Sequence, residues 1–161
     1  QWRNLDYLII DLPPGTGDVQ LTLAQKIPVS GAIIVTTPQD IALLDARKGL
    51  KMFEKVEVPV LGIVENMSIH ICSKCGNEES IFGEGGGSSL AKENEVDLLG
   101  KLPLDISIRE QTDTGKPSVV FDPEGRIAEI YGDIARKAAG KLSAQSKDYS
   151  AKFPKIVIDN N

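Results

Sequence analysis

Hydrophobic residues form short, nearly continuous runs along this chain. Runs rich in Ile, Leu and Val occupy residues 5–12 (LDYLIIDL), 32–36 (AIIVT), 60–64 (VLGIV) and 98–102 (LLGKL). Runs of this length predict strands that are buried on both faces, as in a parallel sheet covered by helices. The sequence therefore predicts four such strands.

Helical spacing separates these runs. After Thr37 and Pro38, apolar residues recur three and four positions apart over residues 41–53, which predicts an amphipathic helix. A long last helix is expected to open at Asp122 and Pro123. Alternating strands and helices indicate an α/β fold with a mainly parallel sheet flanked by helices.

Two segments interrupt this alternation. Residues 68–89 are glycine-rich and carry both cysteines, which predicts a functional loop inserted in a domain that spans residues 1–142. Within that loop, the glycine run at 83–87 is expected to be flexible. Residues 143–161 form a polar tail apart from Phe153 and the apolar residues 156–158, and the pattern leaves open whether the tail adds a strand.

Composition narrows the range of partners. Among 161 residues, 41% are hydrophobic, and 18 basic against 23 acidic residues leave a net charge of -5. An acidic pI of about 4.9 argues against a nucleic-acid binder. No apolar run approaches the roughly 20 residues of a membrane span, and the first residues lack a signal-peptide pattern. We therefore expect a cytoplasmic protein without nucleic-acid or membrane partners, and the missing initiator Met suggests part of a longer protein.

Asp11 lies at the end of the first predicted strand. In an open α/β sheet the ligand crevice lies beyond the carboxyl ends of the strands, where a carboxylate can hold Mg²⁺ beside a phosphate chain. Two prolines and then Gly15 and Gly17 follow within six residues. Glycines let backbone N–H groups approach an anion, so the segment predicts a phosphate-binding edge.

Five strings, in this order, resemble the later part of the Mrp/ApbC family of P-loop ATPases that carry iron–sulfur clusters: DYLIIDLPPGTGD, TTPQDIALLDARKGLKMF, GIVENMS, CSKC and GKLPLD. The resemblance implies a P-loop NTPase fold of the MinD-like (SIMIBI) class that lacks its N-terminal part. It implies that Asp11 is the catalytic Walker B-type acid acting on Mg²⁺, that Gly15 lies in the switch loop that senses the γ-phosphate, and that Asp18 supports that loop. By the same resemblance, Asn66 contacts the adenine base and Pro103 lines the base pocket.

The phosphate-binding lysine loop of that family is missing. No G-x-x-x-x-G-K-[ST] string occurs in the chain. Without such a loop nothing cradles the β-phosphate, so we expect the chain as given not to hydrolyse ATP. The ATP hydrolase activity is expected of the complete protein.

Cys72 and Cys75 form a C-x-x-C pair followed by a glycine. Spacing alone is compatible with a metal site, a redox dithiol or two free cysteines. A zinc ion or a four-iron cluster takes about four protein ligands, and one chain offers only these two thiols and the nearby His70. Two chains related by a two-fold axis would supply two thiolates each, which leaves His70 as a loop histidine.

The resemblance implies a [4Fe–4S] cluster that bridges a homodimer. It implies transfer of that cluster to apo iron–sulfur proteins, delivery from a cluster-assembly scaffold, and Mg-ATP as a cofactor of the complete protein. Two alternatives remain open. One is a zinc-binding structural or interaction module, and the other is a partitioning-type ATPase in which the cysteines have no metal role.

Overall fold

A three-stranded parallel sheet forms the centre of the protein, in the order β1-β2-β5. The computed structural model describes residues 3–13, 17–72 and 74–145. The sheet consists of β1 (Ala32–Thr36), β2 (Val60–Glu65) and β5 (Leu98–Lys101). Three of the predicted strands are confirmed, and so is the α/β class.

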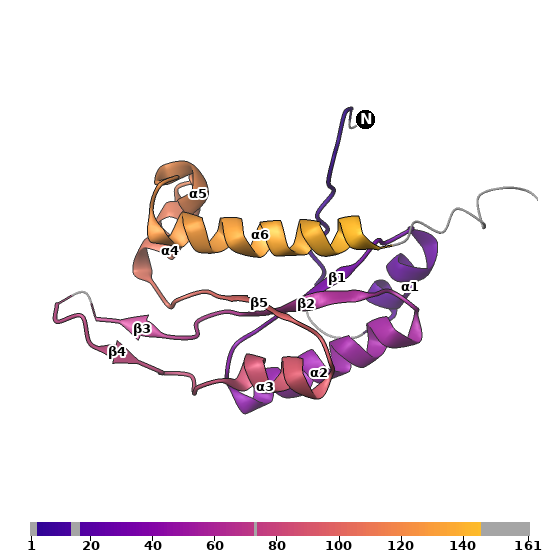
Figure 1. Ribbon diagram of the computed structural model, residues 1–161, viewed down its shortest axis with the longest axis horizontal. Helices are drawn as coiled ribbons and strands as arrows, with labels where there is room; N and C mark the ends of the chain where they lie inside the picture. Colours follow the sequence, from indigo (N-terminus) through magenta and orange to yellow (C-terminus); the bar gives the residue numbers. More distant parts are fainter. Residues whose placement is uncertain (1–2, 14–16, 73, 146–161) are drawn as a thin grey trace, which may run out of the picture.

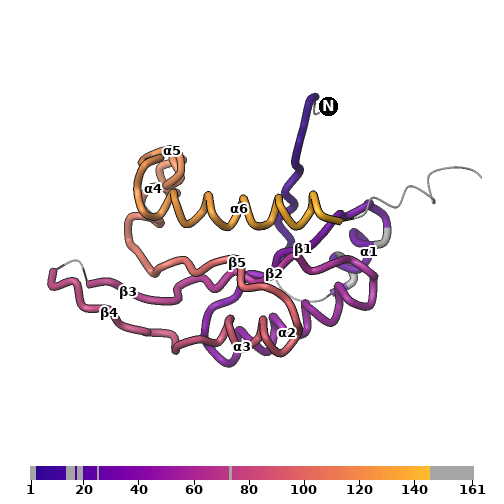
Figure 2. Tube along the Cα trace, in the orientation of Figure 1, coloured from indigo at the N-terminus to yellow at the C-terminus, as the bar shows by residue number. Residues whose placement is uncertain are grey.

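Helices cover both faces of this sheet. Figure 1 shows α6 (Arg126–Ala144) along one face, and α2 (Asp40–Lys55) with α3 (Gly86–Glu93) along the other. The remaining helices are α1 (Asp18–Lys26), α4 (Ile106–Asp113) and α5 (Ser118–Phe121). The Cα trace in Figure 2 follows the same three layers, with α4 and α5 at one end of α6.

Burial of β2 on both faces accounts for the layers. Ile63 is fully buried on the side of α2 and α3, where Leu90 of α3 is buried to the same extent. Leu61 and Val64 belong to a second cluster, which includes Ala138 of α6. A strand covered on both sides needs an uninterrupted apolar run, and residues 60–64 supply it.

The strand predicted at residues 5–12 is wrong for this structure, which assigns no strand to the segment. Most of its side chains are exposed, with Leu8 at 53% and Ile9 at 84%, and only Leu12 packs partly against the core. A strand needs the backbone hydrogen bonds of a neighbour, and within the described residues none pairs with this segment. An apolar sequence alone therefore does not make the strand.

Residues 68–89 are not one loop. They contain an antiparallel hairpin of β3 (His70–Ile71) and β4 (Glu78–Glu79) that projects beyond the sheet (Figure 1). The flexibility predicted for residues 83–87 is also wrong at its end, because Gly86 and Gly87 begin α3. A Cβ on Gly86 would lie 2.7 Å from the Pro38 carbonyl oxygen, so the glycine permits close packing rather than motion.

The last helix begins and ends later than predicted, because α6 starts at Arg126 and the predicted start at Asp122 and Pro123 lies in the turn before it. Helix α6 continues to Ala144, so the predicted tail begins as helix. Residues 146–161, with the apolar residues 156–158, lie outside the described part of the chain.

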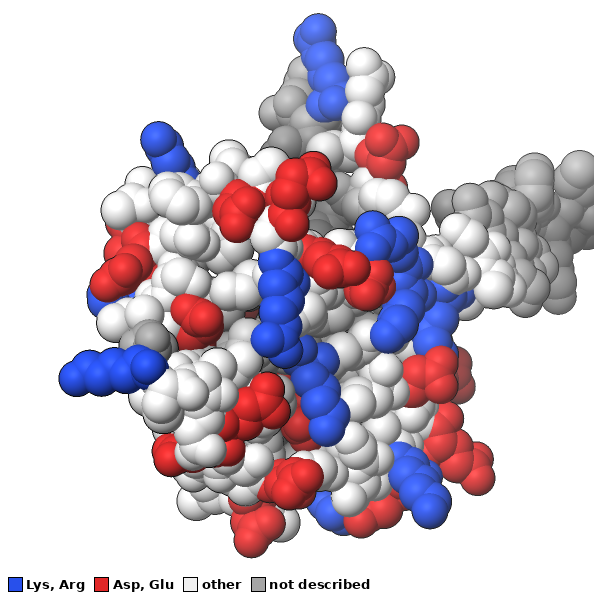
Figure 3. Space-filling view, turned by 60° about the vertical axis from the view of Figure 1, so that its left-hand side comes forward, with Lys and Arg blue, Asp and Glu red and all other residues white. Residues whose placement is uncertain are grey.

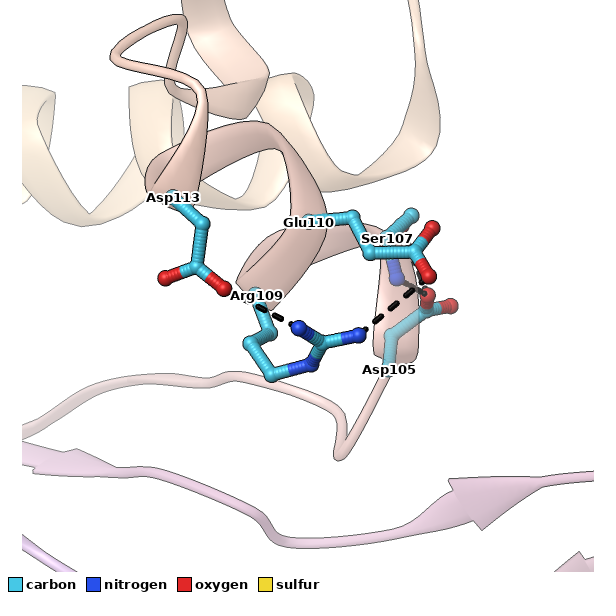
Figure 4. Close-up of polar contacts among 5 residues, drawn as sticks. All are labelled: Asp105, Ser107, Arg109, Glu110 and Asp113. Atoms are coloured by element: carbon cyan, nitrogen blue, oxygen red, sulfur yellow. Dashed lines mark hydrogen bonds and ion pairs between the residues drawn. The ribbon is translucent and has the colours of Figure 1, made fainter.

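A side-chain cap ends the segment that joins β5 to α4. The Asp105 carboxylate accepts hydrogen bonds from Ser107 N at 2.8 Å and Ser107 Oγ at 2.6 Å (Figure 4). Arg109 pairs with Glu110 and with Asp113 on the same helix. An N-cap of this kind fixes where a helix begins, and it therefore limits the freedom of residues 102–104 just before it.

Acidic and basic side chains are interspersed over the face shown in Figure 3, and neither sign dominates it. Among the described residues, no helix combines the length and apolar character needed to cross a membrane.

Gly62 in β2 allows the central strands to approach closely, and this contact can be tested. A Cβ at this position would lie 2.5 Å from the Asp97 carbonyl oxygen and 2.7 Å from Leu99 Cγ. We expect Gly62→Ala to lower the free energy of unfolding by about 1–3 kcal/mol, measured by urea denaturation. The matched control is Gly140→Ala in α6, where the added methyl meets nothing within 4 Å and should stabilise the helix by roughly 0.5–1 kcal/mol. Equal effects of the two substitutions would contradict the packing argument.

Candidate functional site

The carboxyl ends of the three parallel strands meet at one edge of the sheet. Asn66 N donates to the Thr36 carbonyl oxygen at 2.7 Å, which joins the ends of β2 and β1. Leu102 N donates to the Glu65 carbonyl oxygen at 2.8 Å, which joins the ends of β5 and β2. This is the edge at which open α/β sheets bind ligands.

Asn66 begins a tight turn at this edge. Its side-chain oxygen accepts a hydrogen bond from Met67 N at 2.9 Å, and Met67 has a left-handed φ of 54°. A non-glycine residue in this region is uncommon and is held there by its surroundings. The side chain of Asn66 thus stabilises its own turn.

Pro103 lies in the segment that pairs with this turn. Ser68 N donates to the Leu102 carbonyl oxygen at 2.9 Å, and Leu104 N donates to the Ile69 carbonyl oxygen at 2.8 Å. The structure therefore brings the segments of Asn66 and Pro103 to the same edge of the sheet. Their roles toward a nucleotide remain predictions.

A cavity of about 260 Å³ opens beside Pro103. Its lining includes Glu65, Ser68, Lys101 and Arg126, but not Asn66. The two predicted base-contacting residues are thus neighbours along this edge without lining one cavity.

Glu65 is a site residue that the sequence interpretation missed. Its side chain is 1% exposed, and its carboxylate accepts a hydrogen bond from Gly87 N at 2.6 Å. Lys101 Nζ lies 3.4 Å from the other carboxylate oxygen. The sequence did contain a signal for Glu65, since an acidic residue directly follows the apolar run 60–64. A charge buried at such a position must find polar or charged partners.

The described residues also include Asp11, the predicted magnesium residue. It is exposed in an irregular segment, and within the described residues no hydrogen bond or ion pair joins it to Asn66 or to the cysteines. Gly15 lies outside the described residues, and Asp18 is the first residue of α1. The roles predicted for Asp11 toward Mg²⁺ and for Gly15 toward the γ-phosphate therefore remain predictions.

Cys72 and Cys75 lie at the turn of the hairpin. Cys72 N donates to the Asn77 carbonyl oxygen at 2.9 Å, and Gly76 N donates to the Cys72 carbonyl oxygen at 2.8 Å. Gly76 has a φ of 71°, a conformation that favours glycine. Both thiols are free, with Cys72 half-buried and Cys75 exposed. The two thiols therefore share one tight, accessible turn.

The turn favours the thiolate form of Cys72. Hydrogen bonds from the backbone N–H of Lys74, then from that of Cys75, then from the Cys75 side chain lower the pKa of Cys72. Partial burial and the nearby Glu79 carboxylate act in the opposite direction without reversing the shift. A thiolate is the form of cysteine that binds metals.

Within the described residues, no set of three or more His, Cys, Asp or Glu side chains is placed to hold a metal ion. The His70 ring faces the neighbouring segment, with Nδ1 3.2 Å from the Leu104 carbonyl oxygen. The two thiols of the hairpin therefore have no third His, Cys, Asp or Glu ligand beside them among the described residues.

Comparisons with known proteins identify relatives of this chain. The chain is 63% identical over 134 residues to an iron-sulfur cluster carrier protein of Pseudomonas fragi, covering 83% of this chain and 47% of that protein. It is 52% identical over 143 residues to the mouse iron-sulfur cluster transfer protein NUBPL, covering 89% of this chain and 45% of that protein. The chain thus spans less than half the length of these relatives.

Solved structures give the same fold. A nucleotide-binding protein from Archaeoglobus fulgidus in complex with ADP matches with a TM-score of 0.66 and 40% identity, covering 79% of this chain and 51% of that one. The MinD cell division protein of Aquifex aeolicus matches with a TM-score of 0.63 and 22% identity, covering 85% of this chain and 54% of that one, which shows the fold alone. A family model described as the NUBPL iron-transfer P-loop NTPase (ParA) matches residues 1–139. The chain therefore belongs to the family of NUBPL-type iron-transfer P-loop NTPases.

Proposed function

We propose that this chain is the cluster-holding part of an iron–sulfur cluster carrier, in which two copies hold one [4Fe–4S] cluster between their hairpins. The observation that carries the proposal is the pair Cys72 and Cys75 at the accessible turn of a hairpin that projects from the sheet. Similarity to carrier proteins supports the same function.

Ligand number favours a shared cluster. A four-iron cluster takes about four thiolates, and each hairpin supplies two. Because the turn projects from the body of the molecule (Figure 1), a second hairpin can approach it face to face across a two-fold axis. The homodimer is thus part of the proposal.

The cluster is cargo in this scheme, and transfer is ligand exchange. Cys75 is exposed, so a thiolate of an apo iron–sulfur protein can reach the iron bound to Cys75. The incoming thiolate then replaces the Cys75 thiolate as the ligand of that iron. The same access serves loading from an assembly scaffold. Both steps need reduced thiols, which suits a reducing compartment such as the cytoplasm.

Nucleotide binding belongs to the complete protein. We propose that Asn66 and Pro103 contact the base, that Asp11 acts on Mg²⁺, and that Gly15 senses the γ-phosphate. Support comes from the position of Asn66 and Pro103 at the carboxyl edge of a parallel sheet. The chain contains no G-K-[ST] string, so we expect ATP hydrolysis only when a phosphate-binding loop is joined to it.

Single cysteine substitutions test the shared cluster. Either Cys72→Ser or Cys75→Ser removes two ligands from a dimer, one from each chain, so cluster loss should be nearly as complete as in the double variant. The measurement is anaerobic reconstitution followed by iron counting and sizing, with about four irons expected per two wild-type chains. Lys74→Ala, which leaves both thiols in place, is the control. Full loading of one single variant, or tight zinc in place of iron, would refute the proposal.

The pH dependence of alkylation tests the thiolate at Cys72. The pKa of Cys72 is lowered, so a larger fraction of this thiol is ionised at neutral pH. Its rate of reaction with iodoacetamide should therefore rise at a lower pH than that of an ordinary thiol, whose pKa is about 8.5. Cys75→Ala removes one of the stabilising hydrogen bonds and should shift the profile of Cys72 upward, whereas Cys75→Ser retains a donor. Peptide mass spectrometry gives the rate at Cys72 alone. A profile like that of a free cysteine peptide would contradict the turn geometry.

Asp11→Ala tests the nucleotide assignment in a protein that joins this chain to its phosphate-binding loop. Loss of the carboxylate should abolish Mg²⁺-dependent ATP hydrolysis and leave the unfolding transition in place, because Asp11 is exposed. Asp6→Ala, an exposed acid five residues upstream, is the matched control. Unchanged turnover in Asp11→Ala would remove this residue from the site.

A further inference from the structure

Glu65 is a buried carboxylate to which the proposed chemistry assigns no role. It ends the central strand β2, and its side chain is 1% exposed. Burying a carboxylate is unfavourable unless hydrogen bonds and an opposite charge compensate. Here Gly87 N donates to it at 2.6 Å and Lys101 Nζ lies at 3.4 Å, so the charge serves to join three separate segments.

Those segments meet at the base of the cysteine hairpin. The incoming arm starts directly after Glu65, and the returning arm ends at the first turn of α3, which contains Gly87. The hydrogen bond between Glu65 and Gly87 spans 22 residues of sequence and closes the loop that carries Cys72 and Cys75. One carboxylate therefore clasps both arms.

The fit between the two arms is close. A Cβ on Gly87 would lie 2.9 Å from Glu65 Oε2 and 3.0 Å from Glu65 Cβ. Only a glycine lets the N-terminus of α3 approach the carboxylate this closely. The positive end of the helix dipole adds to the attraction.

Lys101 ties the clasp to β5. It is the last residue of that strand, two positions before Pro103. The incoming arm meets the same segment, because Ser68 N and Ser68 Oγ both donate to the Leu102 carbonyl oxygen, at 2.9 Å and 3.2 Å. The clasp thus holds the hairpin against the edge that carries Asn66 and Pro103.

We propose that Glu65 is the positioning residue that fixes the cysteine hairpin to the nucleotide edge of the sheet, so that nucleotide binding at Asn66 alters cluster release. The link to nucleotide and cluster rests on the function proposed above. The clasp itself concerns only residues of this chain.

Amide hydrogen exchange tests the clasp without nucleotide or cluster. In Glu65→Ala, the amides that close the hairpin, those of Ser68, Cys72 and Leu104, should exchange about tenfold faster or more, because the hydrogen bond to a charged group is lost. Lys101→Met removes only the contact to β5 and should show a smaller change at the same amides. It also keeps the test open if Glu65→Ala does not fold.

Glu93→Gln is the matched control. It removes the ion pair between Arg47 and Glu93, 2.7 Å apart, which joins α2 to the other end of α3. This substitution should leave exchange in the hairpin unchanged. Equal acceleration of hairpin and core amides in Glu65→Ala, or no acceleration in either Glu65 or Lys101 variant, would overturn the clasp.

The coupling is tested in a protein that joins this chain to its phosphate-binding loop. Glu65→Ala, which loses the acceptor for Gly87 N, should load as much iron as the wild type and lose the effect of Mg-ATP on the rate of cluster transfer to an apo-ferredoxin. A full nucleotide effect in Glu65→Ala, or in Lys101→Met if Glu65→Ala does not fold, would overturn the coupling. A wild-type protein that takes up no cluster would refute the carrier function, and the exchange data would still decide the clasp.

Discussion

Strand β2 is buried on both faces by helices, and its backbone pairs with β1 on one side and β5 on the other. These contacts fix the direction of the strand up to its carboxyl end. The chain leaves the sheet there through Asn66 and enters the cysteine hairpin. A rigid strand therefore sets where the proposed base contacts and the proposed cluster ligands lie relative to each other.

The sequence predicted the elements whose order is encoded by local pattern. Apolar runs identified β1, β2 and β5, and helical spacing identified α2 and α6. The run at residues 5–12 looked equally strand-like, but a strand also needs a paired neighbour, and pattern carries no information about that. Gly86 and Gly87 looked flexible for a similar reason, since the close contacts with Pro38 and Glu65 come from segments far away in sequence.

The proposed site was predictable in its parts and not in its arrangement. The C-x-x-C spacing identified the thiols, and the resemblance to a carrier family identified Asn66 and Pro103. The role of Glu65 required the fold, because its partners Gly87 and Lys101 lie 22 and 36 positions further along the chain. For Asp11 the sequence context is informative, whereas the structure shows only that its side chain is exposed in an irregular segment.

In the proposed function, two of these hairpins share one cluster. Native mass spectrometry of the anaerobically reconstituted protein measures this most directly, because it reports metal content and chain number in the same particle. We expect one [4Fe–4S] cluster on a dimer and none on the monomer. A cluster held by a single chain, or a dimer that holds zinc and no iron, would contradict it.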